Sequence, residues 1–246
     1  MTTPSDHDLN LTRRGALRLT AGAGAMALLT GLGACGSTKK TAGIGAPIPA
    51  DPAIFHTASV RTVSPAVRPT TGLPSIITRS SWTSAKPKLW DTNPMGRISR
   101  ITIHHDGMPT WIGSAKGDAA DRLQRIRKVH VVDNGWADIG YHYAIDPGGR
   151  IWEARSTTLQ GAHVKDNNEQ NLGILVMGNF NNAIPTPAAE RALVRLIEAN
   201  QLRYKVPVSR VKTHQEINPT ECPGRNLQQY MVQARGSRGV LSAVRV

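Results

Sequence analysis

Leu172-Gly173-Ile174-Leu175-Val176-Met177 is the stretch that decides the fold, because it is a short and nearly continuous apolar run. A strand that is covered on both faces has this composition, whereas a strand with one solvated face alternates apolar and polar residues. The run therefore predicts a central strand that is buried on both of its faces.

An alternating pattern identifies a second strand at residues 101–104. The sequence there is Ile-Thr-Ile-His, so the two isoleucines face one side while Thr102 and His104 share the other. His104 ends this strand, and His105-Asp106-Gly107 follows where the chain must turn. Binding and catalytic residues are commonly found at such junctions with loops, which makes His104 a candidate site residue.

Helical and hairpin patterns surround these two strands. Residues 118–132 place apolar side chains on one stripe of a helix, and a second helix begins at Thr186-Pro187. Residues 141–145 and 150–153 are strand-like, and Asp146-Pro147-Gly148-Gly149 between them is typical of a hairpin turn. Strands that alternate with helices predict an α/β domain with a mixed central β-sheet flanked by α-helices.

Residues 1–34 have the order of an export signal, with basic residues followed by a weakly apolar stretch and then small residues. Thr12-Arg13-Arg14 resembles a twin-arginine signal, although Ala16 stands where such signals favour Phe. Leu32-Gly33-Ala34-Cys35 resembles a lipobox, so we expect lipidation of Cys35. The alternative is a signal peptide with a chance cysteine near its end. Two or more acyl chains on Cys35 would anchor the protein to a membrane at the extracytoplasmic face of the cell envelope.

The rest of the chain divides into a linker, a folded domain and a tail. Residues 36–74 are rich in Thr, Ala, Pro, Ser and Gly and lack periodicity, which predicts a flexible linker. We expect a single folded domain over residues 76–232 and a basic C-terminal tail over residues 233–246. No apolar run reaches the ~18–20 residues that a membrane-spanning helix needs.

The charge of the chain indicates an anionic neighbour. Its 30 Lys and Arg residues against 17 Asp and Glu residues give a net charge of +13 at pH 7. Nucleic acid is the usual partner of such a protein inside a cell, but an exported protein meets cell-wall polymers or lipid head groups instead. We therefore expect no nucleic-acid partner. The alternative is that the charge only keeps the surface soluble.

A cluster at residues 213–224 contains one of the two cysteines of the chain. Two prolines and a glycine make this segment a loop. Because Cys35 is expected to carry lipid, Cys222 is a buried thiol, a reactive thiol or a metal ligand. His214 precedes it in the same segment, and Zn²⁺ accepts both imidazole nitrogen and thiolate sulfur. The spacing alone does not decide between these three interpretations, since a third ligand must come from elsewhere in the sequence.

Several motifs occur in an order that resembles one known family. They are Arg79-Ser80-Ser81-Trp82, residues 101–107, residues 135–143, Gly161-Ala162-His163, residues 172–174, Gly178-Asn179-Phe180 and residues 214–224. Together they resemble the peptidoglycan recognition protein and type 2 N-acetylmuramoyl-L-alanine amidase family, which includes T7-type lysozyme. The resemblance implies a mixed central sheet flanked by helices and a protein that acts on peptidoglycan or muropeptides. We expect a monomer.

The resemblance also implies a zinc site. Catalytic members of the family bind one Zn²⁺ through two His and one Cys, which by motif position are His104, His214 and Cys222. The active-site Tyr of the family follows Asp-Ile-Gly and corresponds to Tyr141. Thr220 stands two residues before the Cys ligand, where phage members have Lys. The other candidates match a segment that lines the substrate groove of the family; they are His163 and Asn168.

The implied reaction is hydrolysis of the amide that joins the lactyl group of N-acetylmuramic acid to L-alanine of the stem peptide. Three protein ligands leave a fourth zinc position for water. Tyr141 would orient that water, and Thr220 would donate a hydrogen bond to the developing oxyanion. The alternative is a non-catalytic module that binds peptidoglycan; such members typically lack the Cys ligand, whereas Cys222 is present here.

Overall fold

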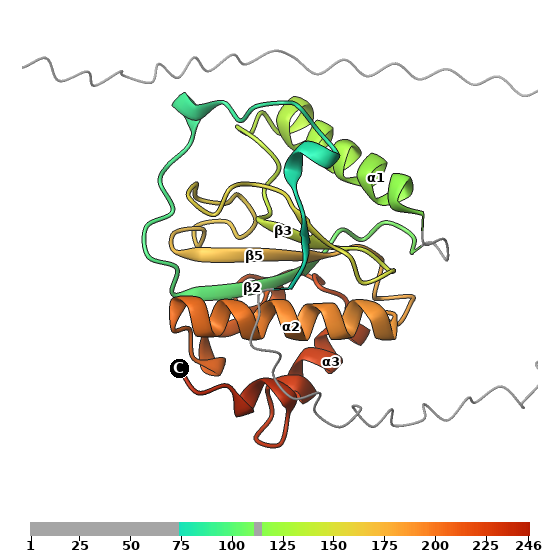
Figure 1. The fold of residues 1–246 in the computed structure, drawn as a ribbon, viewed down its shortest axis with the longest axis vertical. Helices are drawn as coiled ribbons and strands as arrows, with labels where there is room; N and C mark the ends of the chain where they lie inside the picture. The colour runs from blue at the N-terminus through green and yellow to red at the C-terminus, as the bar shows by residue number, and fades with distance from the viewer. Residues whose placement is uncertain (1–73, 111–114) are drawn as a thin grey trace, which may run out of the picture. The chain divides into compact units, whose positions relative to one another are not determined.

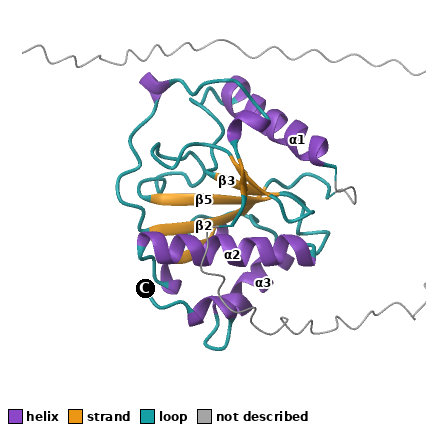
Figure 2. Cartoon of the chain, in the orientation of Figure 1, coloured by secondary structure: helices purple, strands orange, loops and turns teal. Residues whose placement is uncertain are grey.

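The computed structural model describes residues 74–110 and 115–246, so the predicted export signal, Cys35 and the linker up to residue 73 lie outside the described residues. The described chain forms a six-stranded mixed sheet with helices on both faces (Figures 1 and 2), which confirms the predicted fold class. None of the helices in these two ranges is long and apolar enough to cross a bilayer.

The strand order of the sheet is β1-β4-β3-β5-β2-β6. The strands are β1 (Ile76–Ile77), β2 (Arg100–His105), β3 (Tyr143–Ile145), β4 (Ile151–Glu153), β5 (Asn171–Val176) and β6 (Val211–Thr213). β5 runs parallel to its neighbours β2 and β3, and β6 runs parallel to β2. β3 and β4 form the predicted antiparallel hairpin, and β1 adds to β4 in parallel.

Two hydrophobic cores lie on opposite faces of this sheet. Ile101 and Ile103 of β2 face the first core, which also receives side chains from α2 (Pro187–Tyr204) and α3 (Arg225–Arg235). α1 (Lys116–Lys128) covers the second core on the other face, as Figure 1 shows. Every residue of β5 is buried, which confirms the central strand predicted from the apolar run. Thr102 and His104 therefore face the side of α1, as the alternation predicts.

The helices differ from the sequence expectation mainly at their ends. α2 begins at Pro187 as predicted, and Oγ1 of its N-cap residue Thr186 accepts a hydrogen bond from the backbone N–H of Ala189. The helix predicted over residues 118–132 is two segments, because α1 passes into a π-helix at Val129–Asp133. Short 3₁₀ helices occupy Arg79–Ser81, Leu89–Asp91, Val208–Arg210, His214–Glu216 and Val240–Ala243.

The packed domain continues beyond residue 232, the end that is predicted from the sequence. α3 runs on to Arg235, and its residue Ala234 is fully buried. Leu241, in the 3₁₀ helix at Val240–Ala243, is also fully buried and belongs to the core beneath α2 and α3. Residues 233–243 are therefore part of the domain rather than a separate tail.

Candidate metal centre

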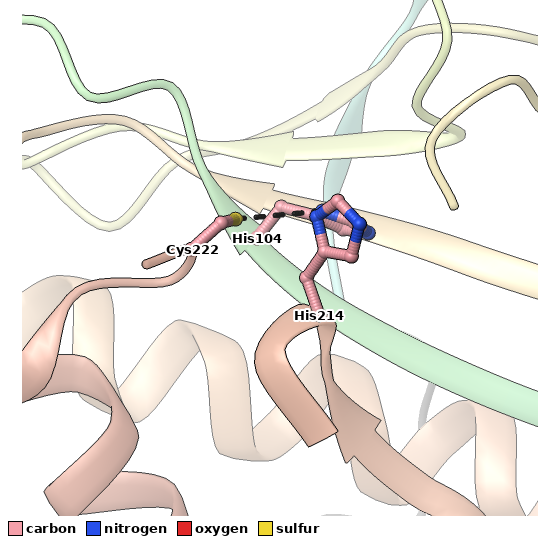
Figure 3. A group of neighbouring side chains, drawn as sticks. All are labelled: His104, His214 and Cys222. Atoms are coloured by element: carbon pink, nitrogen blue, oxygen red, sulfur yellow. Dashed lines mark hydrogen bonds between the residues drawn. The ribbon is translucent and has the colours of Figure 1, made fainter. Parts of the chain in front are cut away.

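His104, His214 and Cys222 point toward one another from three adjacent parts of the fold (Figure 3). His104 lies near the carboxyl end of β2, and His214 directly follows β6, the parallel neighbour of β2. Parallel neighbours end at the same edge of a sheet, so the two imidazoles meet although they are far apart in the sequence. Cys222 comes from the loop that precedes α3. The ligand atoms of the three side chains all lie within 4.8 Å of one another.

The spacing and chemistry of these donors fit a tetrahedral metal ion. Cys222 Sγ lies 3.6 Å from His104 Nδ1. Zn²⁺ at its usual distances of ~2.1 Å from nitrogen and ~2.3 Å from sulfur would hold two such atoms roughly 3.6 Å apart. The backbone N–H of His105 donates to the same sulfur at 3.4 Å, which favours a thiolate. Among the described residues, this is the one group of three such side chains that could share an ion.

Burial sets the protonation of the three side chains. His104 is 1% exposed, and burial lowers its pKa well below 6.5, with a further contribution from His163. Partial burial also lowers the pKa of His214. Both imidazoles are thus neutral at pH 7, as metal ligation requires. Burial raises the pKa of the Cys222 thiol to about 12, so a cation beside the sulfur is needed to favour the thiolate.

Tyr141 and Thr220 lie next to the three donors. The ring centroid of Tyr141 is 5.2 Å from that of His104, and burial raises the pKa of the phenol above its usual 10. The phenol therefore keeps its proton at neutral pH. Thr220 is exposed, and its Oγ1 accepts a hydrogen bond from the backbone N–H of Cys222 at 3.2 Å. This contact uses the oxygen of the hydroxyl as acceptor and leaves its proton available for donation.

The two expected substrate contacts, His163 and Asn168, bond to the protein itself. His163 is 7% exposed, and its Nδ1 lies 3.0 Å from Nε2 of His104. Asn168 Oδ1 accepts hydrogen bonds from the backbone N–H groups of His163 and Val164, both at 2.8 Å. Asn168 thus holds the loop that carries His163, and His163 lies directly behind His104.

Two acidic side chains that were not predicted from the sequence hold the site loops in place. Asp106 accepts from Arg122 Nε at 2.6 Å and from the backbone N–H of Gly178 at 3.0 Å, so it joins the loops after β2 and β5 to α1. Asp138 pairs with two arginines and fixes the segment before Tyr141; these are Arg79 and Arg127. The sequence signal for Asp106 was its place directly after the histidine pair at the end of β2, but its partner Arg122 is set by the tertiary fold.

Comparison with known proteins identifies the family. A family model described as N-acetylmuramoyl-L-alanine amidase matches residues 94–225, which is more than half of the chain and includes all three candidate ligands. The chain belongs to the N-acetylmuramoyl-L-alanine amidase family. The matched range also contains Tyr141 and Thr220, so every residue of the candidate centre lies within the part that defines the family.

Relatives in this amidase family include both recognition proteins and amidases. Peptidoglycan-recognition protein SC2 of Drosophila melanogaster is 32% identical over 154 residues, which cover 62% of this chain and 82% of that protein. The human N-acetylmuramoyl-L-alanine amidase is 28% identical over 159 residues, which cover 62% of this chain but only 27% of the human protein. The similarity therefore spans about a quarter of that larger relative.

Solved structures of the amidase family share the fold. Drosophila PGRP-LB has a TM-score of 0.59 and 26% identity, covering 64% of this chain and 92% of that chain. The amidase LysC from Clostridium intestinale has a TM-score of 0.52 and 27% identity, covering 64% of this chain and 95% of that chain. A mutant of PGRP-LB in which one tyrosine is replaced by phenylalanine was solved in complex with tracheal cytotoxin.

Proposed function

We propose that the protein is a zinc-dependent N-acetylmuramoyl-L-alanine amidase. It hydrolyses the amide between the lactyl group of N-acetylmuramic acid and L-alanine of the peptidoglycan stem peptide. The observation that carries the proposal is the convergence of His104, His214 and Cys222, whose donor atoms lie within 4.8 Å of one another. Two imidazoles and one thiolate form a zinc donor set, and three protein ligands leave a fourth position open for chemistry.

The side chains around the ligands provide the remaining functions that amide hydrolysis needs. When bound, Zn²⁺ supplies a Lewis acid that polarises the amide carbonyl and activates water. Tyr141 keeps its proton and is close enough to His104 to orient the attacking water by a hydrogen bond. Thr220 donates to the oxyanion that develops on the carbonyl, which contributes roughly 3 kcal/mol when such a donor is well placed. A neutral hydroxyl is a weaker donor than an ammonium group, so the contribution of Thr220 is at the lower end.

A peptidoglycan-binding module without catalysis is the second candidate function. Its support is the similarity to peptidoglycan-recognition protein SC2 and to a PGRP-LB mutant solved with tracheal cytotoxin. The presence of Cys222 favours the enzyme, because a module that only binds does not need a thiolate donor beside two imidazoles. In both cases the substrate or ligand is peptidoglycan or a muropeptide, whose carboxylates suit the net positive charge of the chain.

We also propose that the protein is exported and lipid-anchored through Cys35, facing the extracytoplasmic side of the membrane. The support is the lipobox-like sequence that ends at Cys35 and the basic and apolar stretch before it. The linker that follows would let the domain reach the cell wall while the anchor remains in the membrane. With ~40 residues of flexible coil, its typical span is roughly 30–40 Å.

The test of the proposed activity is the substitution Cys222→Ser in the full-length protein. Wild-type protein loaded with Zn²⁺ should release stem peptides with a free L-alanine amino group from purified peptidoglycan, as identified by mass spectrometry. A chelator should stop this release, and Cys222→Ser should lose both the zinc and the release while circular dichroism shows a retained fold. The matched control is Gln229→Ala, an exposed position on α3, which should keep both.

Two outcomes would contradict the proposal. Undiminished release of stem peptides by Cys222→Ser would remove the thiolate from the mechanism. Zinc-loaded wild-type protein that binds muropeptides and releases nothing would instead support the binding module.

A further inference from the structure

His163 has no part in the hydrolysis described above, yet it contacts a proposed ligand directly. Its Nδ1 lies 3.0 Å from Nε2 of His104, on the side of the His104 ring that faces away from Cys222. Its other nitrogen, Nε2, lies 3.0 Å from the backbone carbonyl oxygen of Asn171. With both nitrogens engaged and the side chain buried, His163 has no polar ring atom left for a substrate.

The carbonyl of Asn171 determines the direction of these hydrogen bonds. A carbonyl oxygen only accepts, so His163 Nε2 must carry a proton and donate it. Nδ1 of a neutral His163 then has a lone pair, and it accepts from Nε2–H of His104. A neutral His104 that is protonated on Nε2 has its lone pair on Nδ1. That is the nitrogen 3.6 Å from the sulfur of Cys222.

The surroundings of the two rings favour the neutral form of both. Burial lowers the pKa of both His104 and His163 well below 6.5; the neighbouring His163 lowers the pKa of His104 further, and His142 lowers that of His163. Two positive charges on adjacent buried rings are unfavourable. Both rings are therefore neutral at pH 7, and each has one donor and one acceptor nitrogen.

The fold holds His163 in this position by close contacts on two sides. A Cβ added at Gly173 of β5 would lie 2.6 Å from Cδ2 of His163, and one added at Gly161 would lie 2.5 Å from the same atom. Only glycine leaves room for the imidazole at these two positions. Asn171 is fixed in turn, because its Oδ1 accepts from Oγ1 of Thr102 at 2.7 Å. The backbone carbonyl of Asn171, which ends the hydrogen-bond chain, is thus held in place as part of β5.

We propose that His163 is a positioning residue that fixes His104 as an Nδ1 metal ligand. The inference rests on the proposed function, since it concerns the same zinc site. A hydrogen bond to the far nitrogen of a ligating histidine sets its tautomer and ring orientation and raises its basicity; losing such a partner typically costs 10–100-fold in metal affinity. This role replaces the substrate contact that the family resemblance implies for His163.

The test compares two substitutions of His163 in the full-length protein, with zinc affinity measured by competition against a chromogenic chelator. His163→Leu removes the acceptor and should raise the zinc Kd roughly 10–100-fold. His163→Asn retains an acceptor oxygen near the position of Nδ1 and should restore most of the affinity. The matched control is Asn200→Leu, which removes a buried hydrogen bond to Leu196 on α2 at the other face of the sheet. It should lower stability and leave the zinc Kd unchanged.

A second measurement does not depend on how the variants fold. Long-range ¹⁵N–¹H correlation spectra of histidine-labelled wild-type protein report which ring nitrogen carries the proton. We expect His104 and His163 to be protonated on Nε2 with and without zinc.

The outcomes separate this inference from the proposed function. A zinc Kd of His163→Leu equal to that of the wild type, or His104 protonated on Nδ1, would overturn the positioning role and leave the amidase proposal intact. Wild-type protein that binds no zinc would overturn both.

Discussion

Replacing Gly173 by alanine is expected to displace His163. A Cβ at this position would lie 2.6 Å from Cδ2 and 2.8 Å from Cγ of the imidazole. Non-bonded carbon atoms prefer separations of about 3.5–4.0 Å, so the ring or the strand must move by roughly 1 Å. β5 is paired on both sides, which makes the ring the part that yields. The two hydrogen bonds of the ring, both 3.0 Å long, would then lengthen beyond the normal range.

The expected loss of stability follows from these two effects. Overpacking of a close-packed core costs about 1–3 kcal/mol. Each of the two buried hydrogen bonds that are lost adds about 1 kcal/mol, so the free energy of unfolding should fall by about 3–5 kcal/mol in total. A domain of this size loses roughly 2–4 °C in Tm for each kcal/mol. Urea denaturation followed by circular dichroism, with an unchanged m-value, measures the loss directly.

Gly117 provides the matched control for this substitution. It lies in the first turn of α1, and a Cβ added there meets nothing within 4 Å. Gly117→Ala should therefore leave the protein as stable as the wild type or stabilise it by about 0.5–1 kcal/mol. If Gly173→Ala unfolds at the same urea concentration as the wild type, the contact between β5 and His163 does not constrain the ring and the reasoning is refuted.

Three further predictions concern catalysis, pH and location. Tyr141→Phe should lower the rate of amide hydrolysis by roughly 100-fold or more while one zinc per chain is retained, and an unchanged kcat would exclude the phenol from the reaction. Burial lowers the pKa of His130 and His142 to about 4 from 6.5, so below pH 6.5 the unfolded chain takes up protons that the folded chain does not. The free energy of unfolding should thus fall between pH 6.5 and about 4, by at most about 1.4 kcal/mol per pH unit for each histidine; urea midpoints that stay constant over this range would contradict it. Cys35→Ala should move the protein from the membrane fraction to the supernatant of fractionated cells, and equal partitioning of both proteins would reject lipidation.

The parts of the fold that sequence could predict are those with a local cause. β5 is apolar throughout because both of its faces are covered, and β2 alternates because its two faces differ. The start of α2 is marked by an N-cap threonine followed by proline. α3 was missed although Leu227, Met231 and Ala234 repeat at helical spacing, since the prolines and glycine just before it pointed to a loop.

The candidate site depends on contacts that no local pattern encodes. The resemblance pointed to His104, His214 and Cys222, and the structure brings them together through the parallel pairing of β2 with β6. The position of His163 behind His104 requires the register of β2 against β5 and the close approach of Gly161. Both are set by packing between distant segments, so the family resemblance could draw attention to His163 but could not predict its contact with His104.

The three donor atoms of the candidate centre belong to different kinds of structural element. His104 lies on β2 and His214 directly follows the neighbouring strand β6, whereas the sulfur of Cys222 belongs to a loop. A variant with another third donor, for instance a carboxylate, therefore needs changes in this loop only and leaves both histidines in place. The donor set of the candidate centre can accordingly be varied through this loop alone, and libraries confined to residues 217–224 would sample it without touching β2 or β6.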